Sequence, residues 1–190
     1  LCVSYSGQCL MSALIGRRSG NRGTCAQICR KSYDLYDMNN KKLNKEKYLL
    51  STKDLCTLEN LDKIINIGVD SLKIEGRMKR WEYVYLVTKI YRKAIDNYYA
   101  TLKLSIKDED IISLKKIFNR EFTKGFILNE DNDKFTYDVR PNHKGIKIGT
   151  VLSKKHGYVN IKLTDELNVH DAFRILDDKE DKGLVVNKMY

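Results

Sequence analysis

The chain has 190 residues, of which 42% are hydrophobic and 32% charged, and its formal net charge is +10. No stretch approaches the roughly 20 apolar residues of a membrane helix and no signal peptide is visible, so we expect a cytoplasmic protein without a membrane partner. The positive charge favours a polyanionic partner such as RNA, although a lysine-rich surface would also account for the scattered lysines. The chain begins Leu-Cys-Val without an initiator Met, so we expect an internal fragment of a longer protein.

Residues 1–6 predict a short strand, and a glycine-rich loop with a helical turn through Met11–Ile15 follows. From Leu1 to Tyr33 the chain holds five Arg or Lys residues and no Asp or Glu. Glycines let the loop bend close to a ligand, and arginine forks bind carboxylate or phosphate groups. We therefore expect a cationic rim made of Arg17, Arg18, Arg22 and Arg30, and we expect these four arginines and Asn21 to bind substrate. The alternative is structural, with some of these arginines paired to Asp54 or Glu75.

All five cysteines lie in the first 56 residues, namely Cys2, Cys9, Cys25, Cys29 and Cys56. An odd number of cysteines without a secretory signal argues against a disulfide framework. Zinc sites normally contain a close pair of ligands, whereas iron–sulfur clusters need thiolates and tolerate irregular spacing. All three histidines lie in the second half of the chain. The pattern therefore favours an iron–sulfur cluster, with structural zinc as the alternative.

The next segments predict a hairpin and then a helix, a strand and a second helix. Tyrosines alternate on both sides of an Asn-Asn turn in residues 33–52, which is typical of a hairpin. Residues 51–67 predict a helix that ends at Gly68, residues 69–76 a short buried strand, and the apolar face from Tyr83 to Tyr98 a long helix. This succession is typical of parallel α/β folds. At the carboxyl end of the strand, where α/β barrels place catalytic groups, we expect the catalytic residues Lys73, Glu75 and Arg77, with a salt-bridge network as the structural alternative.

The spacing of the apolar residues changes in the second half of the chain. Residues 108–118 predict a helix with acids first and lysines last, and residues 119–145 are irregular. Apolar residues then alternate from Ile146 to Val185, with turns at Gly157, Asp165 and Gly183, which predicts a small antiparallel β-barrel. The expected organisation is a partial β/α barrel at 1–100, a helical linker at 101–140 and a β-barrel domain at 141–190.

Residues 1–140 closely resemble the collagenase-like peptidases, family thirty-two of the peptidases of unknown catalytic type. The resemblance rests on the stretches LCVSYSGQCLMS, GNRGTCAQICR, KDLCTLENL, GVDSLKIEGRMK and YRKAID. It implies an α/β fold, the C-terminal part of a β/α (TIM-like) barrel followed by a small antiparallel β-barrel domain. The stretches RRSGNRG and FNREFTKGF resemble most the branch associated with hydroxylation of a cytidine in ribosomal RNA. Other branches are associated with hydroxylation of tRNA uridine and of ubiquinone.

The resemblance also implies a cofactor and a substrate class. Its motif assigns the ligands of a [4Fe–4S] iron–sulfur cluster to Cys2, Cys9, Cys25 and Cys56, with Cys29 as the spare or as a replacement for one of them. We therefore expect an iron–sulfur-dependent enzyme for oxygen-independent hydroxylation of an RNA pyrimidine, with prephenate as the implied co-substrate. Two alternatives stay open: a peptidase, as the family name says, and a non-catalytic RNA-binding module with structural zinc.

Overall fold

The computed structural model describes residues 1–5, 7–76, 78–128, 135–176 and 181–189. The chain forms two units, Leu1–Gly145 and Ile146–Tyr190. Residues 101–140, which the sequence suggests as a linker, belong to the first unit and contribute a helix and a strand to it. Within the described ranges, no helix is both long and apolar enough to cross a membrane.

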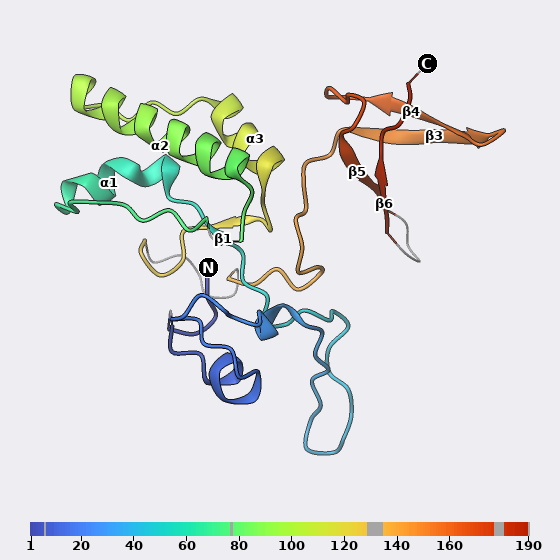
Figure 1. The fold of residues 1–190 in the computed structure, drawn as a ribbon, viewed down its shortest axis with the longest axis horizontal. Coiled ribbons are helices and arrows are strands. Elements are labelled where there is room, and N and C mark those ends of the chain that lie inside the picture. The colour runs from blue at the N-terminus through green and yellow to red at the C-terminus, as the bar shows by residue number, and fades with distance from the viewer. Residues whose placement is uncertain (6, 77, 129–134, 177–180, 190) are drawn as a thin grey trace. The chain divides into compact units, whose positions relative to one another are not determined.

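Three α-helices supply the hydrophobic core of the first unit and lie side by side in Figure 1. Helix α1 spans Leu61–Asn66, α2 spans Trp81–Thr101 and α3 spans Asp108–Ile117, and a 3₁₀ turn at Leu58–Asn60 leads into α1. The core consists of the buried side chains of Leu58, Leu61, Val87, Ile90, Ala94 and Leu114. The helices expected around 83–98 and 108–118 are confirmed, because an apolar face at helical spacing can pack against its neighbours.

Two short parallel strands close the chain around these helices. Strand β1 (Asp54–Leu55) pairs with β2 (Phe122–Thr123), and the Asp54 N–H donates to the Glu121 carbonyl at 2.9 Å. Strand β1 takes the place of the first part of the helix expected over residues 51–67, so helical structure begins only at Leu58. The pairing joins segments that lie on either side of all three helices in the sequence.

The strands expected at 1–6 and 69–76 are not found among the described residues. A parallel strand needs a neighbouring strand to satisfy its hydrogen bonds, and no described segment pairs with either stretch. The expected hairpin at 33–52 is reduced to one antiparallel bridge between Tyr36 and Lys42. Its turn is fixed by Asp37, whose Oδ1 accepts the N–H groups of Asn39 and Lys41 at 2.8 Å each.

The second unit contains two antiparallel hairpins. Strand β3 (Gly149–Lys155) pairs with β4 (Tyr158–Leu163), and β5 (Ala172–Ile175) pairs with β6 (Lys182–Val185). The expected turn at Gly157 is confirmed, since His156 and Gly157 have φ values of 50° and 83°, as a tight two-residue hairpin requires. The expected turn at Gly183 is wrong, because Gly183 lies inside β6. The described strands form separate two-stranded sheets, so a closed barrel in either unit stays a prediction.

Leu61 is 0% exposed, so we expect the protein to lose much stability when this side chain is truncated. Leu61→Ala removes buried apolar surface and leaves a cavity, so we expect the free energy of unfolding to fall by about 2–5 kcal/mol. Leu43→Ala is the matched control because Leu43 is 56% exposed, and its effect should stay below about 0.5 kcal/mol. Urea denaturation followed by circular dichroism measures both variants, and equal losses would contradict the assigned core.

Candidate functional site

The cysteine-rich loop, residues 9–30, is held together by hydrogen bonds within itself. The expected helical turn covers Met11–Ile15, and Ser12 on this turn is buried. The Ser12 hydroxyl donates to the Arg18 carbonyl and accepts the Ala26 N–H at 3.0 Å, so it joins the two halves of the loop. The Arg18 Nε donates to the Thr24 carbonyl at 2.7 Å, which commits part of this guanidinium to structure.

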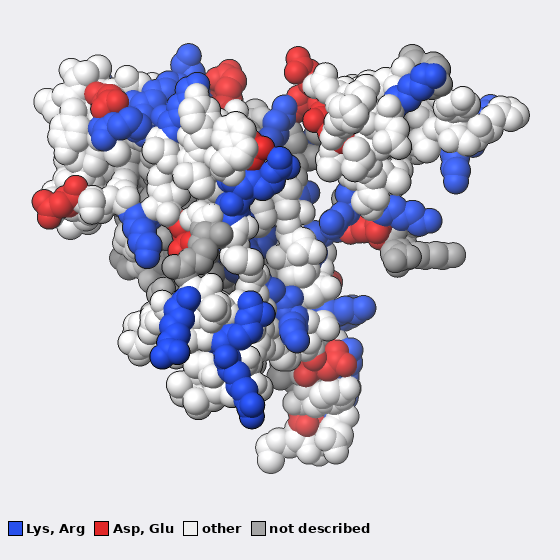
Figure 2. Space-filling model, viewed as in Figure 1, with Lys and Arg blue, Asp and Glu red and all other residues white. Residues whose placement is uncertain are grey.

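The loop presents guanidinium groups to solvent. Arg17, Arg18 and Arg22 are exposed, and Arg17 and Arg22 make no hydrogen bond or ion pair with any residue that the structure describes. Figure 2 shows Lys and Arg side chains spread over the N-terminal part of the chain, at the bottom of the view. Asn21 is also exposed and lies against Gly7, where a Cβ would come within 1.8 Å of the Asn21 Oδ1. Gly7 also has a φ of +82°, so this contact requires glycine.

Arg30, the last of the expected rim residues, turns inward. Its guanidinium donates to the Ser51 Oγ at 2.7 Å, to the Thr52 carbonyl at 2.5 Å and to the Thr52 Oγ1 at 2.8 Å. It also donates to the Leu1 carbonyl at 3.1 Å. Ser51 and Thr52 are completely buried, and burial, followed by the charge of Arg120, lowers the pKa of Arg30. Arg30 therefore anchors the cysteine-rich loop to the segment that precedes β1.

Cys29 interacts electrostatically with three of the other four cysteines. Burial raises the pKa of the Cys29 thiol, the charge of Arg30 opposes this shift, and the thiolates of Cys2, Cys25 and Cys9 add to it. Cys2 and Cys25 are exposed, whereas Cys9 and Cys29 are half-buried. No three His, Cys, Asp or Glu side chains in the described part of the chain form a ready metal-binding arrangement. Three of these four thiols belong to the loop, and the described residues do not close a ligand shell around a metal.

Cys56 has different surroundings. It packs against the helical core, and the Tyr91 hydroxyl lies 3.8 Å from its Sγ. Burial raises the pKa of the Cys56 thiol, hydrogen bonds from Leu58 and Tyr91 oppose this, and no other cysteine is among the groups that influence it. Charge interactions therefore link Cys29 with Cys2, Cys9 and Cys25, whereas the charges that act on Cys56 are those of Glu59 and Lys115.

The expected catalytic residues belong to the segment that precedes α2. Lys73 and Glu75 are exposed, and Arg77 lies outside the described residues. Because residues 69–76 do not pair as a strand, no sheet edge brings Lys73 and Glu75 together. Their catalytic role stays a prediction.

A buried ion pair near Arg30 is not foreseen by the sequence pattern. Arg120 Nε lies 3.0 Å from the Asp54 Oδ1, Nη2 contacts the same oxygen, and the Arg120 backbone N–H donates to Oδ2 at 2.8 Å. The two side chains are only 13% and 16% exposed. The stretch FNREF, which contains Arg120, carries part of the family resemblance, but it does not reveal a partner 66 residues earlier in the chain.

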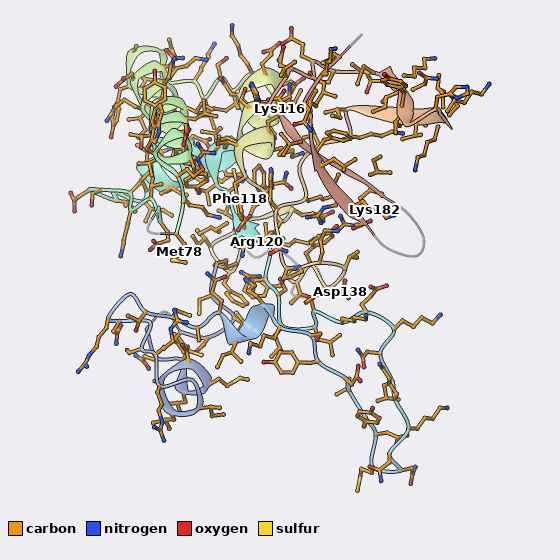
Figure 3. All side chains as sticks on the ribbon, turned by 45° about the vertical axis from the view of Figure 1, so that its right-hand side comes forward. Met78, Lys116, Phe118, Arg120, Asp138 and Lys182 are labelled. Atoms are coloured by element: carbon orange, nitrogen blue, oxygen red, sulfur yellow. The ribbon has the colours of Figure 1, made fainter. Side chains whose placement is uncertain are left out.

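Lys79 is a second residue that the sequence does not single out. Its Nζ lies 2.6 Å from the centroid of the Phe118 ring and 5.6 Å from that of Tyr83. Burial, followed by the charge of Arg120, lowers the pKa of Lys79 to about 8, although Asp54 opposes the shift. Figure 3 shows Phe118 and Arg120 close together on the chain that follows α3. The stretch SLKIEGRMKR contains Lys79, yet nothing in it indicates that this lysine is half-buried.

Comparisons with known proteins identify the relatives of this chain. An uncharacterised protease of Methanocaldococcus jannaschii is 36% identical, over 93% of this chain and 46% of the protease. A 23S rRNA 5-hydroxycytidine synthase of Escherichia coli is 34% identical, over 98% of this chain and 30% of the synthase. A tRNA hydroxylation protein of Bacillus subtilis is 39% identical, over 73% of this chain and 37% of that protein. No solved structure gives a significant match.

The chain spans less than half the length of each of these three relatives. Residues 1–136 match the sequence model of peptidase family U32. This range includes the cysteine-rich loop, helices α1, α2 and α3 and both parallel strands. This match covers most of the first unit and confirms the resemblance seen in the cysteine and arginine motifs. The chain therefore belongs to peptidase family U32.

Proposed function

We propose that this chain is part of an iron–sulfur-dependent enzyme that hydroxylates an RNA pyrimidine without molecular oxygen. The observation that carries the proposal is the group of four thiols, three of which lie in a loop that holds arginines and no acids. Two relatives are named for RNA hydroxylation, one of 23S rRNA and one of tRNA. The substrate base would be a cytidine of ribosomal RNA or a uridine of tRNA.

The donor chemistry of the thiol group suits an iron–sulfur cluster. Cysteine thiolates are the usual ligands of such clusters, and the thiols of Cys2, Cys9 and Cys25 would supply three of them. The shared charge interactions favour Cys29 as the fourth ligand, whereas the family motif favours Cys56. The charge of Arg30 opposes the rise that burial causes in the pKa of Cys29, and so works in favour of the thiolate form that binds metal. When bound, a [4Fe–4S] cluster supplies one-electron redox chemistry.

The exposed arginines suit an anionic substrate. Arg17 and Arg22 keep their guanidinium donors free of the described residues, so both can contact phosphates of the RNA backbone. Prephenate, the co-substrate that we infer from the family resemblance, carries carboxylates that arginine forks also bind. Lys73, Glu75 and Arg77 are our candidates for the groups that act on the base.

A peptidase is the second candidate function, because one relative is named a protease and the family carries that name. Nucleophilic peptidases need a hydroxyl or thiol with a base beside it. His143, the one histidine of the first unit, uses its Nδ1 to accept the Asn119 N–H at 2.9 Å, and its Nε2 lies 3.1 Å from the Lys116 carbonyl. Backbone groups thus engage both nitrogens of this imidazole.

The cluster proposal predicts an iron-containing, brown protein after anaerobic purification of the intact protein. Cys25→Ser should lose iron and visible absorbance, because an alcohol is a poor replacement for a thiolate ligand. Cys29→Ser and Cys56→Ser form a matched pair, and we expect the larger loss of iron from Cys29→Ser. A larger loss of iron from Cys56→Ser would show that Cys56, not Cys29, is the fourth ligand. A colourless protein with bound zinc would contradict the cluster and support an RNA-binding module.

The exposed arginines of the cysteine-rich loop lead to a second prediction. Arg22→Lys keeps the positive charge but removes the forked guanidinium, so it should lower RNA hydroxylation by about tenfold or more. Mass spectrometry of digested RNA measures the oxygen added to the base, and iron content checks that the cluster persists. Arg80→Lys is the matched control, since Arg80 is 86% exposed and, within the described part of the chain, pairs with Glu82 at 2.8 Å. Full activity of both Arg22→Lys and Arg17→Lys would make the loop structural. Peptide cleavage with unmodified RNA would support the peptidase.

A further inference from the structure

The region around β1 and β2 gathers more positive than negative charge. The charges of Arg30, Lys79 and Arg120 influence one another, and Asp54 is the one carboxylate that acts on all three. Arg120 engages both oxygens of Asp54, one through its side chain and one through its backbone N–H. Three cations therefore share one carboxylate whose oxygens are already in use.

Arg30 and Lys79 have no anionic partner among the residues that the structure describes. Arg30 donates only to neutral oxygens, which belong to Ser51, Thr52 and Leu1. The Lys79 ammonium makes no hydrogen bond or ion pair within the described ranges, and it contacts the aromatic rings of Phe118 and Tyr83. Burying a cation without a counter-charge is unfavourable, so an anion placed here would stabilise this group of cations.

Phe118 supports two of the cations on one ring. The Lys79 Nζ lies 2.6 Å and the Arg120 Cζ 5.3 Å from its centroid. His143 stacks on the same ring, with centroids 5.2 Å apart and planes at 15°, which fixes the orientation of the ring. Arg120 uses Nε and Nη2 for Asp54, so its Nη1 donates to none of the described residues. The two cations that carry free donors, Lys79 and Arg120, thus lie against the same aromatic ring.

We propose that Lys79 and Arg120 bind a small oxyanion, a carboxylate or phosphate group, with Arg30 adding positive charge from the side of the cysteine-rich loop. An ammonium and a guanidinium together offer charge-assisted hydrogen bonds to such a group. A doubly charged oxyanion balances the excess of cations over the single carboxylate. The site needs neither the cluster nor the reaction proposed above, since none of its donors is a thiol.

The protonation of Lys79 provides a direct test in the intact protein. Carbon-13 NMR of labelled lysine side chains follows its titration, and Lys79→Met identifies its signal. A bound oxyanion favours the ammonium form, so saturating inorganic phosphate or malonate should raise the pKa of Lys79 from about 8 by about one pH unit or more. Calorimetry should show phosphate affinity falling about tenfold or more in Lys79→Met.

Lys89→Met is the matched control, because Lys89 is exposed and its Nζ also lies 5.6 Å from a tyrosine centroid, that of Tyr85. This variant should bind phosphate like the wild type. Lys79→Met should fold, since an apolar side chain replaces an unpaired, half-buried cation. The wild-type titration can also be followed without the variant, because the Lys79 signal is expected to titrate near pH 8, well below an ordinary lysine.

The probes also distinguish the source of the oxyanion. A rise in the pKa of Lys79 with phosphate or malonate supports a site for a small molecule, and a rise only with a short single-stranded RNA supports a site for a backbone phosphate. No rise with any of the three, or equal losses of affinity in Lys79→Met and Lys89→Met, would overturn the proposal. Phosphate binding that persists in cluster-free Cys25→Ser would show that this site stands when the proposed function fails.

Discussion

The ion pair between Asp54 and Arg120 is the constraint on which the first unit depends. Asp54 lies in β1, and Arg120 lies two residues before β2 begins, so the pair fixes the two strands that enclose the three helices in the chain. Both side chains are largely buried, and removing one partner of such a pair typically costs about 3–5 kcal/mol because the other charge is left alone. Arg30 contacts Ser51 and Thr52 just before β1, so the cysteine-rich loop is fastened to the same strand.

Elements that depend on near neighbours could be predicted from the sequence. Helices α2 and α3 follow from apolar residues at helical spacing, and the turn at His156 and Gly157 follows from a glycine between two alternating stretches. The stretch at 69–76 has equally suitable strand residues but no pairing partner among the described segments. Strand β1, in turn, interrupts an expected helix because residues far along the chain pair with it.

In the candidate site, too, the features that could be predicted are those that do not depend on contacts between distant residues. Residue type alone marked the cysteines and the arginines of the loop, and Arg17 and Arg22 are exposed as a binding rim requires. The inward turn of Arg30 depends on the buried hydroxyls of Ser51 and Thr52, more than twenty residues away. The burial of Lys79 depends on the ring of Phe118, which follows the helix packed against α2. Such contacts leave no periodic trace in a sequence.

The burial of Cys56 divides the cysteines by chemical reactivity. The thiolate, not the thiol, attacks disulfides, alkylating agents and peroxide, so a raised pKa and burial slow all three reactions. Cys56 has both protections, because it packs against the core and its burial raises the pKa of the thiol even though the Tyr91 hydroxyl donates to the sulfur. Cys2 and Cys25 are open to solvent. In air, oxidation therefore begins in the cysteine-rich loop and its flanking residues, while the thiol in the helical core is the last to change.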